Sequence, residues 1–139
     1  MRMNVEYRIN EKISTQAFVD LLNASGLGKR RPVDDLSCMQ AMIENANLTI
    51  SAWEEDQLIG IARSVTDFSF ACYLSDLAVD KRCQGLGIGK ELQRLTQAQL
   101  GPKCKLILLA APDANDYYPK IGYENNPRCW VISSTDKIG

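Results

Sequence analysis

The chain has 139 residues, of which 45% are hydrophobic, so it is long enough for one domain with a substantial core and too short for two ordinary domains. Its 16 lysine and arginine residues nearly balance 17 aspartate and glutamate residues, which argues against a dedicated nucleic-acid-binding protein. No apolar run approaches the roughly 20 residues of a membrane span, so we expect no membrane insertion. Five cysteines without Cys-x-x-Cys spacing and the absence of histidine predict reduced thiols, a cytoplasmic protein and no metal site.

The first part of the chain predicts one strand and two short helices. Residues 5–9 alternate between apolar and polar side chains, which is typical of a strand. Ser14 is a suitable N-cap for a helix that ends near Gly26, and residues 36–43 predict a second helix. The basic residues 29–31 lie between these helices. They are either solvated or in contact with substrate or nucleotide.

A hairpin and a third strand follow. Residues 48–53 and 58–65 flank the acidic turn 54–57, which is a hairpin pattern. After a turn near Asp67, residues 70–79 predict another strand.

The second half predicts a helix between two parallel strands. Residues 87–100 form the helix, and residues 105–111 are nearly all apolar, as expected for a strand covered on both faces. Residues 114–121 predict a short, interrupted helix, and residues 129–133 predict a final strand. The apolar face of the long helix consists of Ile88, Leu92, Leu95 and Ala98. We therefore expect a single α/β domain that spans residues 1–139.

Three cysteines bear on the core and on reactivity. Cys72 and Cys129 lie in apolar strand-like runs, so we expect both to be buried. Cys83 lies in a glycine-rich turn and is expected to be exposed, with a nucleophilic role as an alternative.

The turn between the third strand and the long helix is the most informative segment. Gly85, Gly87 and Gly89 remove side chains from the backbone, so its N–H groups can approach a ligand closely. These groups lie at the positive end of the helix dipole, which favours phosphate oxygens. The spacing fits neither a P-loop nor a dinucleotide fingerprint. The turn predicts a phosphate-bearing small-molecule ligand, and a glycine turn without a ligand is the alternative.

Gln84, Gly87 and Gly89, preceded by Val79 on the strand, match the motif Gln/Arg-x-x-Gly-x-Gly/Ala. Residues 117–123, Tyr-Tyr-Pro-Lys-Ile-Gly-Tyr, match a later aromatic-Tyr-x-Lys-x-Gly-aromatic segment. The chain thus resembles the GNAT superfamily of acetyl-CoA-dependent N-acetyltransferases, as a small single-domain member of bacterial type. The resemblance covers nearly all of the chain and is weakest before residue 48.

The resemblance implies a mixed, mostly antiparallel sheet with a splayed central parallel strand pair and helices on both faces. It implies acetyl-CoA as acyl-donor cosubstrate, without a metal. Lys81, Arg82 and Lys90 either reach the nucleotide phosphates or are merely solvated. The residues that the resemblance assigns to acetyl-CoA are Leu77, Ala78, Val79, Gln84, Gly85, Leu86, Gly87, Ile88, Gly89 and Lys90.

Two residues are candidates for the proton transfers of acetyl transfer. Tyr118 matches the superfamily tyrosine that protonates the CoA sulfur, or else it packs beside Tyr117. Pro119 follows it directly and disfavours helical backbone angles at Tyr118. Asp76, on the strand with Leu77 but facing the opposite side, is the candidate base. Its alternatives are a hydrogen bond to a neighbouring loop or to Arg63. Weaker candidates for the base are Glu6 and Tyr73, and a water chain is a further alternative.

The resemblance implies transfer of an acetyl group to a primary amine of a small molecule by direct attack in a ternary complex. The alternatives are acetylation of a protein or peptide amine and a non-catalytic CoA-binding sensor. A homodimer through the last strand is a possible assembly.

Overall fold

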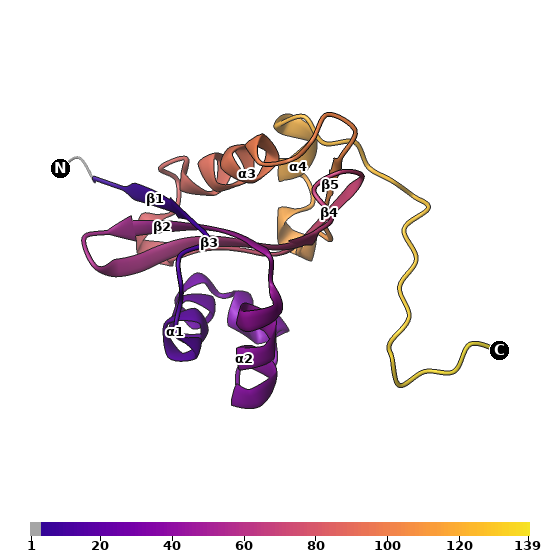
Figure 1. The fold of residues 1–139 in the computed structure, drawn as a ribbon, viewed down its shortest axis with the longest axis horizontal. Helices are drawn as coiled ribbons and strands as arrows, with labels where there is room; N and C mark the ends of the chain where they lie inside the picture. The colour runs from indigo at the N-terminus through magenta and orange to yellow at the C-terminus, as the bar shows by residue number, and fades with distance from the viewer. Residues whose placement is uncertain (1–3) are drawn as a thin grey trace. The chain divides into compact units, whose positions relative to one another are not determined.

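The computed structural model describes residues 4–139, which divide into two compact units that we describe separately (Figure 1). The first unit reaches to Leu109, and the second spans Ala110–Gly139. The strands of the first unit are β1 (Glu6–Ile9), β2 (Leu48–Glu54), β3 (Gln57–Thr66), β4 (Ala71–Val79) and β5 (Lys105–Ile107). Its helices are α1 (Thr15–Ser25), α2 (Leu36–Asn45) and α3 (Ile88–Ala98), with short 3-10 turns η1 (Leu27–Arg30) and η2 (Lys81–Cys83). The single-domain organisation stays a prediction.

The five strands form one mixed sheet in the order β1-β2-β3-β4-β5. The first three pairings are antiparallel, and β4 pairs with β5 in parallel. Helices α1 and α2 cover one face and α3 covers the other (Figure 1). This arrangement confirms the predicted fold class, but the parallel pair lies at the edge of the five-stranded sheet and not at its centre.

Local sequence signals set the ends of the helices. The Ser14 hydroxyl accepts a hydrogen bond from the Ala17 N–H over 3.1 Å and caps α1, as predicted. Helix α1 ends at Gly26, whose φ of +90° is a left-handed conformation that glycine adopts without strain. Asp35 caps α2 by accepting from the Cys38 N–H over 3.0 Å. These caps therefore fix where both helices of this face begin and where α1 ends.

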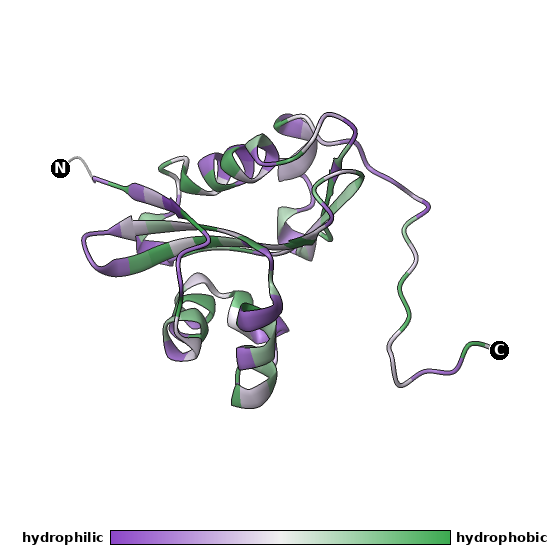
Figure 2. Ribbon diagram, in the orientation of Figure 1, coloured by the Kyte–Doolittle hydropathy of each residue, from purple (hydrophilic) through white to green (hydrophobic). Residues whose placement is uncertain are grey.

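Both faces of the sheet are packed. The cluster on the α3 side includes Ile50, Leu74, Ile88 and Leu92, whereas the cluster on the α1 side includes Phe18, Leu22, Met39 and Ile61. Figure 2 shows that α3 carries both hydrophobic and hydrophilic residues and that the tip of the β2–β3 hairpin is hydrophilic. On α3 the predicted apolar face is confirmed except at Ala98, which is exposed. Thr96 is buried instead, because its hydroxyl donates to the Leu92 carbonyl over 2.7 Å and needs no water.

Strand β5 is shorter and more exposed than predicted. It spans three residues and not the seven predicted at 105–111, and the exposed fraction of Ile107 is 44%. Its pairing with β4 covers only Ala71↔Lys105, Cys72↔Leu106 and Tyr73↔Ile107. An apolar run becomes a fully buried strand only where partners cover it, and β5 has one strand partner within the described sheet.

The second unit contains a 3-10 turn η3 (Pro112–Ala114) and a short helix α4 (Tyr117–Lys120). These two elements confirm the predicted interrupted helix over residues 114–121. The predicted strand at residues 129–133 is wrong, because this segment forms no strand and exposes 89% of Trp130. The prediction that Cys129 is buried fails for the same reason, since no element covers the segment within its unit.

Candidate active site

The turn after β4 is ordered by its own side chains. The Asp80 carboxylate caps η2 by accepting from the Arg82 N–H over 3.0 Å. The Gln84 side chain returns to the end of β4, where its amide nitrogen donates to the Val79 carbonyl over 3.0 Å. This hydrogen bond therefore fixes the start of the turn relative to the end of β4.

The glycines of the turn leave its backbone accessible. Gly85 and Gly87 have φ angles of +81° and +82°, a region that other residues adopt with strain. A methyl group added at either glycine would meet no protein atom within 4 Å, so open space lies beside this backbone. Gly87 precedes α3, and within the described residues no side chain caps this helix. The first N–H groups of α3 are thus available to an anion at the positive end of the helix dipole.

The cationic side chains of the turn differ in their partners. Arg82 donates to Asp80 over 2.9 and 3.2 Å, and these hydrogen bonds hold the pKa of the Asp80 carboxyl below its ordinary value. Lys81 and Lys90 are exposed. Exposure is compatible with both predicted alternatives for these lysines, phosphate binding and solvation. The Arg82 side chain is instead held by its hydrogen bonds to Asp80.

Cys83 is buried, contrary to the prediction. Its exposed fraction is 3%, and it packs in the cluster beneath α3 with Ile88 and Leu92. Burial raises the pKa of the Cys83 thiol above its ordinary value. A thiol that is buried and harder to ionise is a poor nucleophile, so these contacts favour a structural role.

Strand β4 is unpaired along part of one side. Its last pair with β5 is Tyr73↔Ile107, and among the described residues no strand pairs with residues 74–79 on the side away from β3. Leu77 and Val79 pack with the cluster on the α3 side, and Ala78 packs on the opposite side. The open strand edge thus leads directly into the glycine turn.

Asp76 is fully buried between two arginines. Its Oδ1 accepts from the Nε of Arg31 over 2.5 Å, and its Oδ2 accepts from the Nε of Arg63. The hydrogen bond to Arg63, one of the predicted alternatives, is therefore present. Arg63 also donates to the Met42 carbonyl over 3.1 Å, in the last turn of α2. A cation near the C-terminal end of α2 also interacts favourably with the helix dipole.

Arg31 is the residue that sequence reasoning did not place. Lys29 and Arg30 are exposed, as one of the two alternatives predicted for the basic segment, but the Arg31 side chain turns inward to Asp76 and Ser75. The Arg31 and Asp76 positions are 45 residues apart, and no local pattern connects them. The available signal was a cationic run near the first helix together with an acidic residue in an apolar strand.

The other two candidate bases have different surroundings. Glu6 accepts a hydrogen bond from Arg8 over 3.1 Å at the start of the sheet. Tyr73 is 40% exposed at the last pair between β4 and β5. Neither residue contacts the arginine pair around Asp76.

Tyr118 lies in α4 of the second unit. Its ring packs edge-to-face against Tyr117 at 5.2 Å and against Tyr123 at 5.3 Å between centroids. Pro119 follows it as the third helical residue, where a missing N–H breaks no helical hydrogen bond, so the expected disruption at Tyr118 does not occur. Burial, with a smaller contribution from Tyr117, raises the pKa of the Tyr118 phenol. The phenol therefore stays protonated at neutral pH and can donate a proton.

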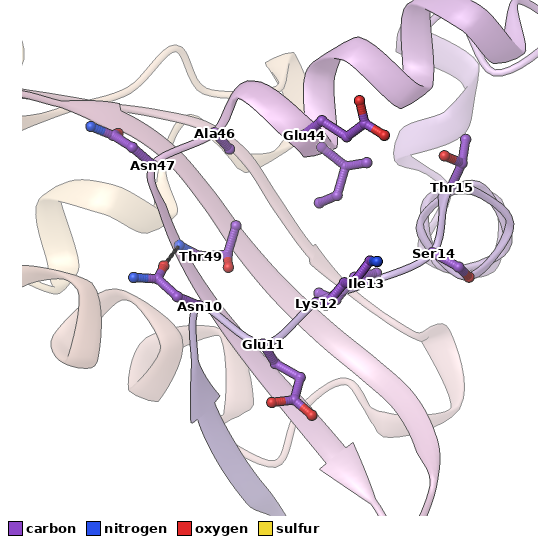
Figure 3. Close-up of a pocket in the computed structure, with 11 residues that line it drawn as sticks. Asn10, Glu11, Lys12, Ile13, Ser14, Thr15, Glu44, Ala46, Asn47 and Thr49 are labelled. Atoms are coloured by element: carbon purple, nitrogen blue, oxygen red, sulfur yellow. Dashed lines mark hydrogen bonds between the residues drawn. The ribbon is translucent and has the colours of Figure 1, made fainter.

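A cavity of about 390 Å³ lies elsewhere in the first unit, where the chain enters α1 and leaves α2 (Figure 3). Most of the residues that line it are of polar type, including Asn10, Glu11 and Glu44. Asn10 is fixed to β2 because its Oδ1 accepts from the Thr49 N–H over 2.9 Å. None of the predicted site residues lines this cavity.

Residues 23–128 match the family model described as an acetyltransferase (GNAT) domain. The chain belongs to this family. It is therefore an N-acetyltransferase domain, as the glycine turn and the residues 117–123 predicted. The GNAT family uses acetyl-CoA.

Sequence relatives of this GNAT chain carry the names of acetyltransferases. The "Uncharacterized N-acetyltransferase ycf52" of Pyropia yezoensis is 28% identical over 127 residues, which cover 85% of this chain and 69% of the relative. The "Histone acetyltransferase TAP1" of Glycine max is 33% identical over 79 residues, or 53% of this chain and 33% of the relative. This chain thus spans only part of the length of either relative.

Solved structures share the GNAT fold. An acetyltransferase of the GNAT family from Streptococcus pneumoniae TIGR4 has a TM-score of 0.74 at 17% identity, covering 93% of this chain and 98% of that one. An aminoglycoside N-acetyltransferase in complex with CoA has a TM-score of 0.71 at 14% identity, covering 98% of both chains.

Two further properties of the described residues concern membranes and metals. No helix within residues 4–139 is long and apolar enough to cross a membrane. In the same part of the chain, no three histidine, cysteine, aspartate or glutamate residues gather in a way that could hold a metal ion.

Proposed function

We propose that this GNAT chain transfers the acetyl group of acetyl-CoA to a primary amine of a small molecule, by direct attack in a ternary complex. The observation that carries the proposal is the uncapped N-terminus of α3, which follows two left-handed glycines at the open end of β4. Acetyl-CoA supplies an activated thioester. The residues of the turn fit its phosphates, because the backbone N–H groups are free and the space beside Gly85 and Gly87 is open.

Each part of the chain has a separate task in this proposal. Residues 84–90 bind the phosphates, and the unpaired edge of β4 at Leu77, Ala78 and Val79 offers backbone groups to the pantetheine arm. Holding the thioester beside the amine supplies much of the acceleration, because the two reactants lose their translational freedom on binding and not in the chemical step. Tyr118 donates a proton to the departing sulfur. Its raised pKa supports this role because the donor must be protonated at neutral pH.

The base role of Asp76 has less support. Both carboxylate oxygens accept from arginines and the residue has no exposed surface, so an amine proton cannot reach the carboxylate without displacing an ion pair. We propose that Asp76 braces β4 and that water takes the amine proton.

Acetylation of a protein amine is the second candidate. It is favoured by the soybean relative named a histone acetyltransferase, which matches 79 residues of this chain at 33% identity. The fold alone does not distinguish a small-molecule amine from a protein amine, because a structure that shares this fold is an aminoglycoside acetyltransferase.

The test is release of CoA from acetyl-CoA by the purified chain, measured across a panel of small primary amines and a panel of lysine peptides. Turnover with small amines and none with peptides is expected. Turnover with peptides alone would replace the proposal with the second candidate. Acetyl-CoA binding without turnover on either panel would indicate a non-catalytic sensor.

A further inference from the structure

Strand β4 contains a β-bulge beside its open edge. Leu74 pairs with Ser64 and Asp76 pairs with Arg63, so Ser75 is the extra residue between two adjacent positions of β3. In a regular strand Leu74 and Asp76 would share a face. Here Leu74 packs in the cluster on the α3 side, whereas Ala78, in step with Asp76, packs in the cluster on the α1 side. The bulge therefore decides which face each residue of the open edge occupies.

Two arginines bind the bulged residues from the α1 side of the sheet. Arg31 donates from Nη2 to the Ser75 carbonyl over 2.7 Å and from Nε to Asp76 over 2.5 Å. Arg63 donates from Nη2 to the Ser75 hydroxyl over 2.9 Å and from Nε to the other oxygen of Asp76. We call these four residues the bulge cluster. Its bidentate geometry fixes orientation as well as distance, which a single ammonium group cannot do.

The two arginines hold the bulge from different parts of the chain. Arg63 belongs to β3, which already pairs with β4. Arg31 belongs to the connection between α1 and α2, and its Nη1 also donates to the Arg30 carbonyl over 2.8 Å. Arg31 thus attaches this connection to β4 and binds the backbone carbonyl of Ser75, the extra residue of the bulge.

We propose that Arg31 is a positioning residue for acetyl transfer. By holding the Ser75 carbonyl and Asp76, it fixes the bulge and therefore the orientation of residues 77–79, the open edge along which the acyl donor lies. The proposal rests on the proposed function, since it requires acetyl-CoA at this edge. The phosphate-binding turn begins beyond Val79 and has its own supports in Asp80 and Gln84, so nucleotide binding does not depend on Arg31.

The test compares Arg31→Gln with Arg30→Gln, which removes the same charge from an exposed neighbour. In Arg31→Gln we expect kcat to fall at least about tenfold while calorimetric affinity for CoA stays within about threefold, because misplacement of the thioester acts on the chemical step. Arg30→Gln is expected to match the unaltered chain. A kcat for Arg31→Gln within twofold of that chain would overturn the proposal. So would a loss of CoA affinity as large as the loss of kcat.

Arg31→Lys separates charge from geometry. It keeps the cation but cannot donate in parallel to Ser75 and Asp76, so we expect it to restore melting temperature more than kcat. Complete recovery of kcat would show that charge alone matters and would overturn the proposal. If Arg31→Gln does not fold, Arg31→Lys carries the kinetic comparison.

Hydrogen exchange tests the bulge without any turnover. Amides of residues 74–79 should exchange faster in the Arg31 variant, with exchange in α3 unchanged, and equal exchange along β4 would refute the role of Arg31. A chain that binds acetyl-CoA but acetylates no amine would contradict the proposed function, and exchange along β4 would still decide the role of Arg31.

Discussion

The side-chain amide of Gln84 donates a hydrogen bond to the carbonyl oxygen of Val79 over 3.0 Å, so the first residue of the glycine turn is tied to the last residue of β4. This contact fixes the start of the turn relative to the open edge of β4, and the turn leads into the proposed anion site at the start of α3. Gln84 therefore supports the position of the turn through its contact with the strand.

The first prediction concerns this hydrogen bond. Gln84→Ala should lower acetyl-CoA affinity about 2- to 10-fold, because one intramolecular hydrogen bond contributes about 0.5–1.5 kcal/mol to holding the turn. Calorimetric titration measures the change. Gln97→Ala, which truncates an exposed glutamine of α3, is the control and should bind as the unaltered chain does. Equal affinities of the two variants would remove Gln84 from the binding site.

The second prediction concerns Gly87. Gly87→Asp should weaken acetyl-CoA binding at least about tenfold, because a carboxylate opposes the phosphates at the start of α3 and any side chain strains the φ of +82°. Gly87→Asn introduces a side chain of the same size without the charge, so it should lose less affinity. If both variants fold and bind with unaltered affinity in calorimetry, the phosphate site lies elsewhere.

The third prediction concerns Tyr118 as proton donor. Tyr118→Phe keeps the ring against Tyr117 and Tyr123 but removes the phenol, so kcat should fall roughly 10²-fold with little change in acetyl-CoA affinity. Tyr117→Phe removes a neighbouring phenol and should retain activity. Undiminished kcat in Tyr118→Phe would leave Tyr118 with a packing role alone.

The pH dependence of kcat gives a second test of Tyr118. Burial raises the pKa of this phenol above the ordinary value of 10.0, so the donor is present at neutral pH and is lost only as the pH rises through the raised pKa. The alkaline decline of kcat should therefore lie above pH 10 and be absent in Tyr118→Phe. An alkaline decline that persists in the variant belongs to another group.

The fourth prediction concerns the five thiols. Cys129 is exposed, whereas burial raises the pKa values of the Cys72 and Cys83 thiols. An alkylating reagent at neutral pH should modify Cys129 at least about tenfold faster than Cys72 or Cys83, as mass spectrometry of peptides would show. The unfolded chain, in which all five thiols are accessible, is the control. Rapid modification of Cys83 with loss of activity would revive the nucleophile alternative.

Sequence reasoning succeeded where the signal is local. Ser14 and Gly26 mark the ends of α1, and Gln84 with the following glycines marks the turn that leads into α3. It failed at residues 129–133, because an apolar run becomes a strand only beside a partner strand. It also missed Arg31, whose contact with Asp76 depends on how the connection between α1 and α2 meets β4. The position of the turn was thus readable from spacing, whereas the contacts of the bulge cluster with β4 were not.

The last prediction separates the two roles of Asp76. Asp76→Asn should lower stability by about 3–5 kcal/mol, because removing the carboxylate charge leaves two guanidinium groups without their buried counter-ion. The acidic limb of the kcat/KM profile should stay where it is, since a brace takes up no proton during turnover. Thermal unfolding and the pH profile are measured on the same preparation. Asp34→Asn removes one exposed carboxylate and controls for the change in net charge. If Asp76→Asn melts like the unaltered chain and its acidic limb shifts, Asp76 acts as the base and the brace is refuted.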